Sequence, residues 1–304
     1  MCRGLRKNGG GLLASDHPLL PVGLAFLAAA LWGLWWAPIR MLEEMGLSGA
    51  WGSVVMNLGA AAVSGAVLLL FRYPLQLSQR ACAGAALVAV AVVFYSVALT
   101  LADVVRVILL FYLAPAWSKI IETVFMGQPW RMSATVALVA SLTGAFFVLG
   151  GGVSLESVGF GDALAVLAGI AWAAGAALIF TGPRANPMAL TFVTAAAGVV
   201  LGMVFIALGL GGGELRIGEL RGVGLGLGFG AIYVLPILAL TLWSAQRLTP
   251  AVLSFLLTAE ILSGVGSSAY FLDEPFTGWQ MFGATLVILA AVMEVVSSLR
   301  PARA

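Results

Sequence analysis

Residues 160–181 read FGDALAVLAGIAWAAGAALIFT, with Asp162 as their one charged residue and Trp172 near their middle. A helix needs about 20 mainly apolar residues to cross the hydrocarbon core of a bilayer. The stretch has this length and composition, so it predicts a membrane-spanning helix. Ten such runs follow one another along the chain. They cover residues 18–39, 47–71, 81–102, 104–126, 133–152, 160–181, 187–210, 222–244, 250–272 and 279–299.

The composition of the whole chain indicates the same environment. Of its 304 residues, 62% are hydrophobic and 9% are charged, whereas an average soluble domain carries about 25% charged residues. A compact soluble chain of this length would lack the polar residues that must cover its surface. Lipid is therefore the expected solvent, and the predicted fold class is an all-α integral membrane protein with ten transmembrane helices.

The basic residues orient these helices. With the N-terminus in the cytoplasm, ten lie at cytoplasmic ends, four at outer ends, and Lys119 within a span. The ten are Arg3, Arg6, Lys7, Arg72, Arg80, Arg131, Arg184, Arg247, Arg300 and Arg303, and the four are Arg40, Arg106, Arg216 and Arg221. This bias follows the positive-inside rule. An even number of spans then returns the C-terminus to the cytoplasm as well.

The two halves of the chain share a sequence pattern. Residues 24–32 align with residues 164–172, and Leu, Ala, Leu, Ala and Trp recur in register. Gly127-Gln128-Pro129 similarly corresponds to Asp273-Glu274-Pro275. Each half holds five spans, and an odd number makes the second copy enter from the opposite face. Inverted repeats of this kind are typical of transporters, with the substrate site near the midplane. The predicted divisions are the tail 1–17, the repeats 18–153 and 154–299, and the tail 300–304.

Several short motifs resemble those of the EamA-type exporters of the drug/metabolite transporter superfamily. They are Trp32-Gly33, Leu113-Ala-Pro115, Gly161-Asp162 followed by Trp172, and Asp273-Glu274-Pro275. The segment 103–117 is most similar to the YddG-type aromatic amino acid exporters. The resemblance implies export of amino acids, aromatic and other neutral ones, from the bacterial cytoplasm across the inner membrane. Together with the repeats, it predicts alternating access with broad specificity.

Glu260 is the first candidate for a functional residue. It lies about ten residues into the ninth span, near the midplane, where a charged group is costly unless it faces the bundle interior or water. We expect it to bind a substrate ammonium group or to take up and release a proton. The alternative is a structural carboxyl group that is hydrogen-bonded to a neighbouring helix.

Six aromatic side chains are the other candidates for substrate binding. They are Trp32, Tyr95, Tyr112, Trp117, Trp172 and Tyr233, which lie deep within their spans. Aromatic rings with polar tips would form a cavity that suits an aromatic or aliphatic side chain. For each of them, packing between helices is the competing interpretation.

Lys119 and Glu122 share one helix face because they are three residues apart. They are predicted to form either a structural ion pair or a gate on the cytoplasmic side. Gly222, Gly226 and Gly230 recur every four residues, a spacing that lets another helix approach closely. Helix kinks are expected at Pro38, Pro115 and Pro236, each of which removes a backbone donor.

Other classes of function lack support in the sequence. The net charge is +2, which argues against nucleic acid, and Cys2 and Cys82 have no metal-binding spacing. An enzyme embedded in the membrane would need clustered catalytic side chains, yet His17 is the single histidine. We therefore expect no catalytic centre, metal or cofactor. The expected partners of this monomer are lipid and a small molecule. Remaining alternatives are an exporter of cationic or lipophilic drugs such as methyl viologen, and a scaffold or receptor without transport.

Overall fold

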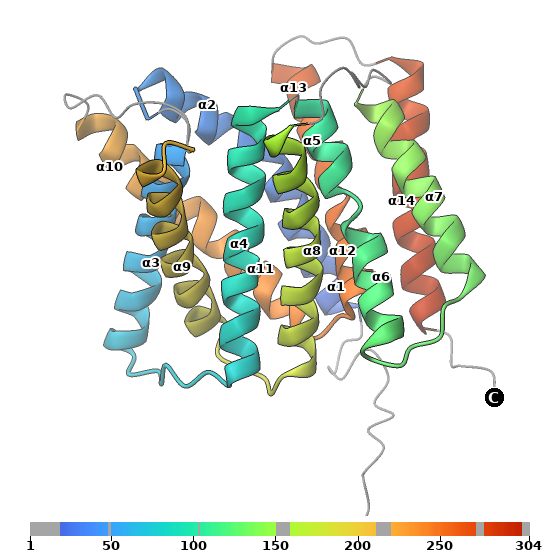
Figure 1. The fold of residues 1–304 in the computed structure, drawn as a ribbon, viewed down its shortest axis with the longest axis horizontal. Coiled ribbons are helices and arrows are strands. Elements are labelled where there is room, and N and C mark those ends of the chain that lie inside the picture. The colour runs from blue at the N-terminus through green and yellow to red at the C-terminus, as the bar shows by residue number, and fades with distance from the viewer. Residues whose placement is uncertain are drawn as a thin grey trace, which may run out of the picture.

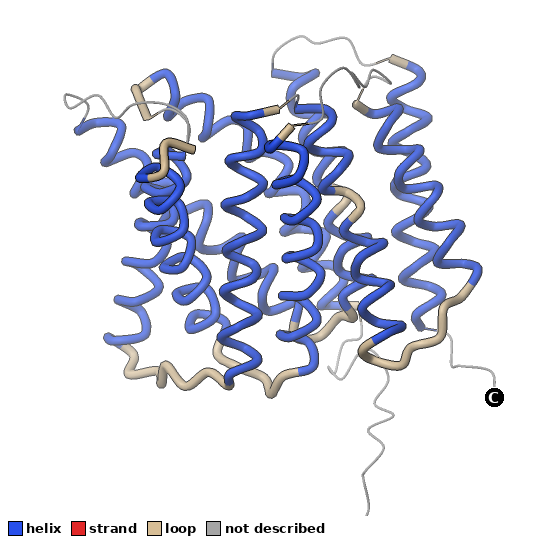
Figure 2. Tube along the Cα trace, viewed as in Figure 1, coloured by secondary structure: helices blue, strands red, loops and turns tan. Residues whose placement is uncertain are grey.

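The computed structural model describes residues 19–47, 50–102, 104–149, 159–210, 220–271 and 277–299. Helices joined by loops make up nearly all of these residues. The helices stand side by side in a bundle, and the described loops lie at its two ends (Figures 1 and 2). We call these the upper and lower ends, as they stand in Figure 1. The predicted tails 1–17 and 300–304, the predicted repeat boundary at residues 153 and 154, and Asp273-Glu274-Pro275 lie outside the described residues.

The first half of the chain holds seven α-helices and one short 3-10 helix within the described residues. They are α1 (Leu20–Trp32), η1 (Gly33–Trp35), α2 (Trp36–Glu44), α3 (Ala50–Leu70), α4 (Gln79–Leu101), α5 (Val104–Phe111), α6 (Ala114–Val124) and α7 (Met132–Val148).

The second half holds seven α-helices and one short π-helical segment within the described residues. Its described elements are α8 (Phe160–Thr181), α9 (Pro187–Ala207), α10 (Leu220–Phe229), η2 (Gly230–Val234), α11 (Leu235–Ala245), α12 (Pro250–Leu257), α13 (Glu260–Phe271) and α14 (Gly278–Leu299).

Polar caps start two of the long helices at the lower end. The Ser78 hydroxyl accepts the backbone N–H of Ala81 at 3.1 Å before α4. The Asn186 side chain accepts the N–H of Met188 at 2.8 Å before α9, whose first residue is Pro187. Such residues satisfy the free N–H groups of a first turn, and proline removes one of them. Local sequence therefore fixes where these helices begin.

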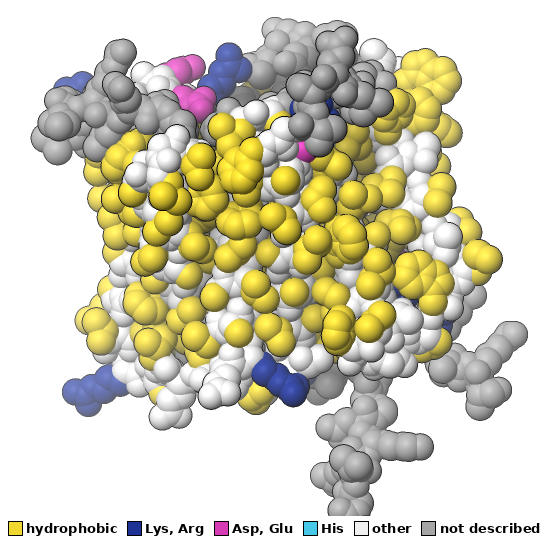
Figure 3. Space-filling model, viewed as in Figure 1, with side chains coloured by type: hydrophobic (Ala, Val, Ile, Leu, Met, Phe, Trp, Pro, Cys, Tyr) yellow, Lys and Arg dark blue, Asp and Glu magenta, His cyan; other side chains and the backbone are white. Residues whose placement is uncertain are grey.

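The helices have the length and surface of a multi-pass membrane protein. Among the described residues, eight helical segments are long and apolar enough to cross a bilayer. Two shorter apolar helices, Met132–Val148 and Pro250–Gly264, lie where the fifth and ninth spans are predicted. On the face in Figure 3, hydrophobic side chains cover the middle and charged ones gather at the two ends. An apolar band between polar ends is the surface that a bilayer requires.

The glycines of the eighth predicted span face a neighbouring helix, as their spacing predicts. A Cβ added at Gly226 would lie 2.8 Å from Val55 Cγ1, and one at Gly230 would collide with the Met56 carbonyl of α3. Gly224 and Gly228 have open space at the same position. The every-fourth glycines therefore allow the close approach of α10 and η2 to α3.

The largest buried apolar cluster fills the lower half of the bundle. It joins side chains of α1, α4, α6, α8, α9, α11 and α12, among them Val88, Ile179, Leu242 and Leu253, each at most 2% exposed. These four residues lie between the lower ends of their helices and the helix middles. The lower half is thus closely packed between these helices.

Four of the predicted spans are interrupted. Three interruptions come shortly before a proline: η1 before Pro38, the break at Tyr112 and Leu113 before Pro115, and η2 before Pro236. Proline lacks the N–H that would bond to the carbonyl four residues earlier, so the helix loses its regular pattern there. The fourth interruption separates α12 from α13 at Thr258. The Thr258 hydroxyl bonds to the Phe255 carbonyl at 2.6 Å, a local bond that competes with the helix pattern.

Candidate functional site

A cavity of about 640 Å³ lies in the upper half of the bundle. It reaches the upper end at α2, where the exposed residues Arg40 and Glu43 line it. Pro115 on α6, Trp172 on α8 and Ser254 on α12 are the described lining residues that lie nearest the lower end. The volume is within the usual range for small-molecule sites.

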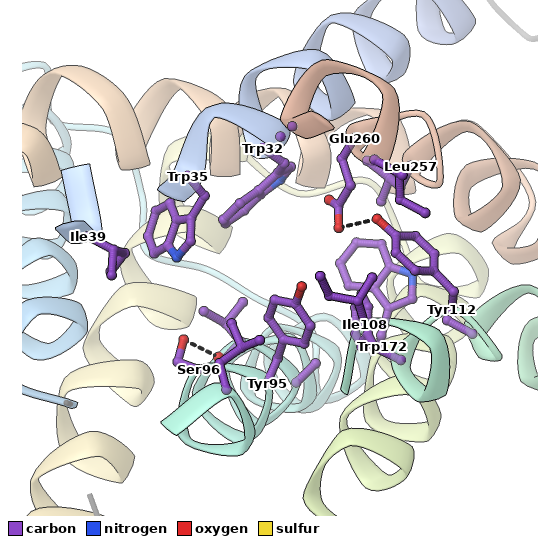
Figure 4. Close-up of a pocket in the computed structure, with 18 of the residues that line it drawn as sticks. Trp32, Trp35, Ile39, Tyr95, Ser96, Ile108, Tyr112, Trp172, Leu257 and Glu260 are labelled. Carbon is purple, nitrogen blue, oxygen red and sulfur yellow. Dashed lines mark hydrogen bonds between the residues drawn. The ribbon is translucent and has the colours of Figure 1, made fainter. Parts of the chain in front are cut away.

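Glu260 projects into this cavity from the first residue of α13, where the helix interruption ends (Figure 4). Its carboxylate oxygen Oε1 accepts a hydrogen bond of 2.6 Å from the Tyr112 hydroxyl. Tyr112 itself lies at the interruption between α5 and α6, and it is 4% exposed. The bond thus joins two interrupted helices, one from each half of the chain. Glu260 is partly buried, and its carboxylate needs such a donor because removing a charge from water without one is costly.

Aromatic rings form the rest of the cavity wall. Trp32 and Trp35 lie on the side opposite Tyr112 and Trp172, and the Tyr95 hydroxyl points into the space between them (Figure 4). The ring centroids of Trp32 and Trp35 are 5.2 Å apart, and those of Tyr95 and Phe111 are 4.7 Å apart. Rings at these distances pack favourably against one another. The wall therefore has a fixed shape with apolar faces and a few polar tips.

Two of the indole N–H groups are occupied by protein hydroxyls. Trp32 Nε1 donates to Thr241 Oγ1 at 3.2 Å, which ties α1 to α11. Trp172 Nε1 donates to Ser254 Oγ at 3.1 Å, which ties α8 to α12. Each indole therefore offers its apolar face, rather than its N–H group, to a molecule in the cavity.

The structure brings together five of the seven residues that the sequence suggests for substrate binding. The cavity is lined by Trp32, Tyr95, Tyr112, Trp172 and Glu260.

Trp117 and Tyr233 lie outside the lining. The Tyr233 hydroxyl donates to the Leu31 carbonyl, and its ring stacks on Trp35 at a centroid distance of 6.0 Å. Trp117 lies between α6 and α8, where its ring borders Gly169 and its Nε1 is buried without a hydrogen-bond partner. Tyr233 supports the wall from behind.

Lys119 and Glu122 lie below the cavity on α6. Lys119 Nζ is 3.1 Å from Glu122 Oε2 and 3.9 Å from Glu294 Oε1. The other oxygen of Glu122, Oε1, accepts the backbone N–H of Ala251 at 2.8 Å. The predicted ion pair is therefore present, and it also reaches α12 and α14.

Trp35 and Ser254 are among the lining residues that the sequence reasoning did not single out. Trp35 lines the cavity and touches both Trp32 and Tyr233, and its position three residues after Trp32 was an available signal. Ser254 lines the cavity floor. A serine within an apolar helix gives no such signal, because its role depends on which helices surround it.

The chemistry of the cavity is that of one carboxylate among aromatic rings. A carboxylate attracts an ammonium group, and aromatic faces add cation–π attraction when a cation lies over them. Among the residues that the structure describes, no group of three or more His, Cys, Asp or Glu side chains is placed to hold a metal ion. The arrangement is suited to binding an ammonium group or another organic cation.

Comparisons with known proteins concern the family and the fold. Residues 159–296 match the EamA-like transporter family. A crystal structure of a protein that is 17% identical superposes with a TM-score of 0.66, over 91% of this chain and 97% of that chain. This likeness supports the fold alone. No curated protein matches the chain. The second half therefore holds an EamA-like transporter domain, and that family moves small molecules across membranes and is not enzymatic.

Proposed function

We propose that the chain exports small molecules that carry an amino group, neutral and aromatic amino acids among them, from the bacterial cytoplasm by alternating access. The observation that carries this proposal is the bond between Glu260 and Tyr112, set in an aromatic cavity where two interrupted helices meet. Transporters commonly build their substrate sites from discontinuous helices near the midplane. The EamA-like domain at residues 159–296 supports the same class of function.

The direction of the interrupted helices supports two inverted five-helix repeats. The pair α5–α6 runs from the upper to the lower end, whereas α12–α13 runs from the lower to the upper end (Figure 1). Each pair is the fourth predicted span of its half, counted within residues 18–153 and 154–299. The same element therefore occurs twice in opposite orientation, as an inverted repeat requires.

Loop charges support an orientation with the lower end in the cytoplasm. Arg72, Arg80, Arg131, Arg184 and Arg247 all lie at the lower ends of their helices or in the lower loops (Figure 1). Basic residues favour the cytoplasmic face. In this orientation both termini are cytoplasmic, the membrane is the bacterial inner membrane, and the cavity faces the outside.

An amino acid fits the cavity in one orientation. Its ammonium group lies against Glu260, and its side chain lies among the aromatic rings. Its carboxylate then needs donors, and the Tyr95 hydroxyl points into the cavity beside Glu260 (Figure 4). The similarity of segment 103–117 to aromatic amino acid exporters rests in part on Tyr112, which this geometry places beside Glu260.

A second candidate is the export of organic cations without a carboxylate. The observation in its favour is the uneven charge of the lining. Glu260 lies deep in the cavity, whereas Arg40, the cationic side chain among the described lining residues, lies at the upper rim and is exposed. A compound such as methyl viologen needs no cationic partner.

Efflux from proteoliposomes distinguishes the two candidates. Vesicles are loaded with labelled phenylalanine, with phenethylamine, which has the same ring and amine but no carboxylate, or with methyl viologen. We expect efflux of phenylalanine, and a loss of about tenfold or more in Glu260→Gln, since one lost charge interaction is worth roughly 1.4 kcal/mol or more. Glu44→Gln, which removes an exposed carboxylate at the upper end, is the control and should transport normally.

The Tyr95→Phe variant sharpens this result. If Tyr95 binds the carboxylate, loss of its hydroxyl should slow the efflux of phenylalanine more than the efflux of phenethylamine. Movement of phenethylamine and methyl viologen without phenylalanine would select the cation exporter. No flux of any of the three compounds through correctly inserted protein would contradict the proposal.

A further inference from the structure

Below the cavity, three buried hydrogen bonds tie α12 to its neighbours. Ser118 Oγ on α6 and Ser254 Oγ on α12 are 2.8 Å apart, and Trp172 Nε1 on α8 donates to the same Ser254 oxygen at 3.1 Å. One turn lower, the N–H of Ala251 donates to Glu122 Oε1 at 2.8 Å. We call Ser118, Glu122, Ala251 and Ser254 the α6–α12 latch. These bonds close the bundle between the cavity and the lower end.

Glu122 is the strongest part of the latch. Pro250 is the first residue of α12 and has no N–H, so Ala251 carries the first free donor of that helix. A carboxylate at this position also interacts favourably with the helix dipole. Lys119 balances the charge at 3.1 Å, while Glu122 is 3% exposed. Breaking the contact leaves a buried carboxylate without its donor, which is strongly unfavourable.

The latch shares an atom with the cavity. Ser254 and Trp172 both line the cavity floor, and Ser254 Oγ is also the oxygen that holds α6 and α8 to α12. The Ser254 hydroxyl has one donor and two acceptor positions, so a molecule that takes the position used by Ser118 or Trp172 displaces that partner. Occupation of the cavity and closure of the lower half are therefore linked through one side chain.

Helix interruptions separate the latch from the binding residues. The break at Thr258 lies between α12, which carries Ser254, and α13, which carries Glu260. The break at Leu113 lies between α6, which carries Ser118 and Glu122, and α5. Hinges of this kind let half a helix move while the other half stays in place. The lower halves α6 and α12 are thus able to separate without displacing α5 and α13.

We propose that the α6–α12 latch is the cytoplasmic gate of the transporter, and that Ser254 is the residue through which a bound molecule loosens it. The inference rests on the proposed function for its direction across the membrane. Opening separates α12 from α6, and a ligand favours opening only if it binds the open state more tightly. This assigns the predicted ion pair of Lys119 and Glu122 to the gate.

A disulfide across the latch tests the proposal directly. The full chain carries Ser118→Cys and Ser254→Cys in a background with Cys2→Ser and Cys82→Ser. The two native oxygens are 2.8 Å apart, so the new sulfur atoms are within reach of a bond of about 2 Å. Mild oxidation should form the disulfide and stop efflux from proteoliposomes, and reduction should restore it. Each single-cysteine variant, treated with the same oxidant, is the control.

A labelling experiment tests the gate without any substrate. A reporter, Leu257→Cys in the same background with Cys2→Ser and Cys82→Ser, lies on the cavity wall, and a membrane-impermeant maleimide is applied to one side of vesicles at a time. We expect labelling from the outside in every folded variant, which also verifies folding. Labelling from the cytoplasmic side should rise by about fivefold or more in Glu122→Ala, because a loss of roughly 1 kcal/mol or more shifts a two-state equilibrium by that factor. Glu122→Gln keeps an oxygen that accepts from Ala251, so cytoplasmic labelling should rise less in this variant. Glu44→Ala is the control, and its cytoplasmic labelling should not change.

The outcomes separate the gate from the transport proposal. Unchanged cytoplasmic labelling in Glu122→Ala, absence of the Ser118–Ser254 disulfide after oxidation, or normal efflux in the cross-linked protein would each overturn the gate. Side-specific labelling that responds as expected, without flux of the tested compounds, would keep the gate and reject the proposed substrates.

Discussion

The upper and lower halves of the interrupted helices each hold a carboxylate, and the two carboxylates differ in their hydrogen-bond partners. In the upper half, Glu260 receives one hydroxyl from Tyr112 and faces an open cavity of about 640 Å³. In the lower half, both oxygens of Glu122 are bonded, one to Ala251 and one to Lys119, within packed helices. A carboxylate facing a cavity is available to a ligand, whereas one bonded at both oxygens holds helices together. Glu260 is partly exposed, whereas Glu122 is 3% exposed, so exposure and bonding together distinguish the binding residue from the closing one.

The upper half also has its own structural ion pair, which extends the comparison. Arg106 Nε on α5 donates to Asp162 Oδ1 on α8 at 2.6 Å, with side chains that are 11% and 5% exposed. The other oxygen of Asp162 accepts the N–H of Gly159 at 2.8 Å and caps α8. This pair joins α5 to α8, whereas the latch joins α6 to α12. We expect the first contact to persist during transport and the second to open.

The largest effect should come from breaking the upper ion pair. Asp162→Ala removes the ion pair with Arg106 and the cap on Gly159 together, so the free energy of unfolding should fall by about 2–5 kcal/mol. The thermal midpoint of the purified protein in detergent measures it. Glu44→Ala removes one partner of an exposed pair at 3.9 Å and should change the midpoint little, since exposed pairs contribute little. If Asp162→Ala instead raised cytoplasmic labelling of Leu257→Cys without loss of stability, the distinction between the two contacts would fail.

The next largest effect, on the KM for efflux, should come from removing the hydrogen bond between Tyr112 and Glu260. Tyr112→Phe removes the donor to Glu260 while keeping the ring. A hydrogen bond to a charged group is worth about 1.5–3 kcal/mol, so the KM for efflux should change by roughly tenfold or more. Tyr73→Phe alters an exposed tyrosine at the lower end and is the matched control. A normal KM in Tyr112→Phe would place substrate binding away from Glu260.

A smaller effect on KM should follow from changing Tyr233, which packs against Trp35 outside the cavity lining. Tyr233→Phe loses the bond to the Leu31 carbonyl but keeps the stacking on Trp35. An ordinary hydrogen bond is worth about 0.5–1.5 kcal/mol, so KM should rise about two- to tenfold, with cytoplasmic labelling unchanged. Loss of transport as large as in Glu260→Gln would show that Tyr233 contacts the substrate itself.

The smallest effect is expected at the cavity rim. Arg40 is exposed, and its nitrogen Nε is 3.9 Å from Glu44. Arg40→Ala should change efflux of phenylalanine and phenethylamine by less than about threefold, because exposed charges are well screened. A selective loss of phenylalanine efflux would instead identify Arg40 as the partner of the amino acid carboxylate.

The sequence by itself determined the helices and most of their irregular points. Its apolar runs of about 20 residues predict the membrane segments, and Pro115 and Pro236 predict breaks that the structure contains. The every-fourth glycines predict the contact with α3. It also singles out Glu260, since a carboxylate near the middle of an apolar run is rare and costly. These features depend on composition and local spacing, which are present in the chain itself.

Only the tertiary structure decided which side chains share the cavity and which close the bundle. Trp117 and Tyr233 look like Trp172 and Tyr112 in sequence, yet the first two lie outside the lining. Helices in lipid are apolar on all sides, so periodicity does not reveal which face turns inward. The pairing of Glu260 with Tyr112, and of Ser254 with Ser118, joins residues that are 148 and 136 positions apart. Such contacts arise from the packing of whole helices, which no local pattern specifies.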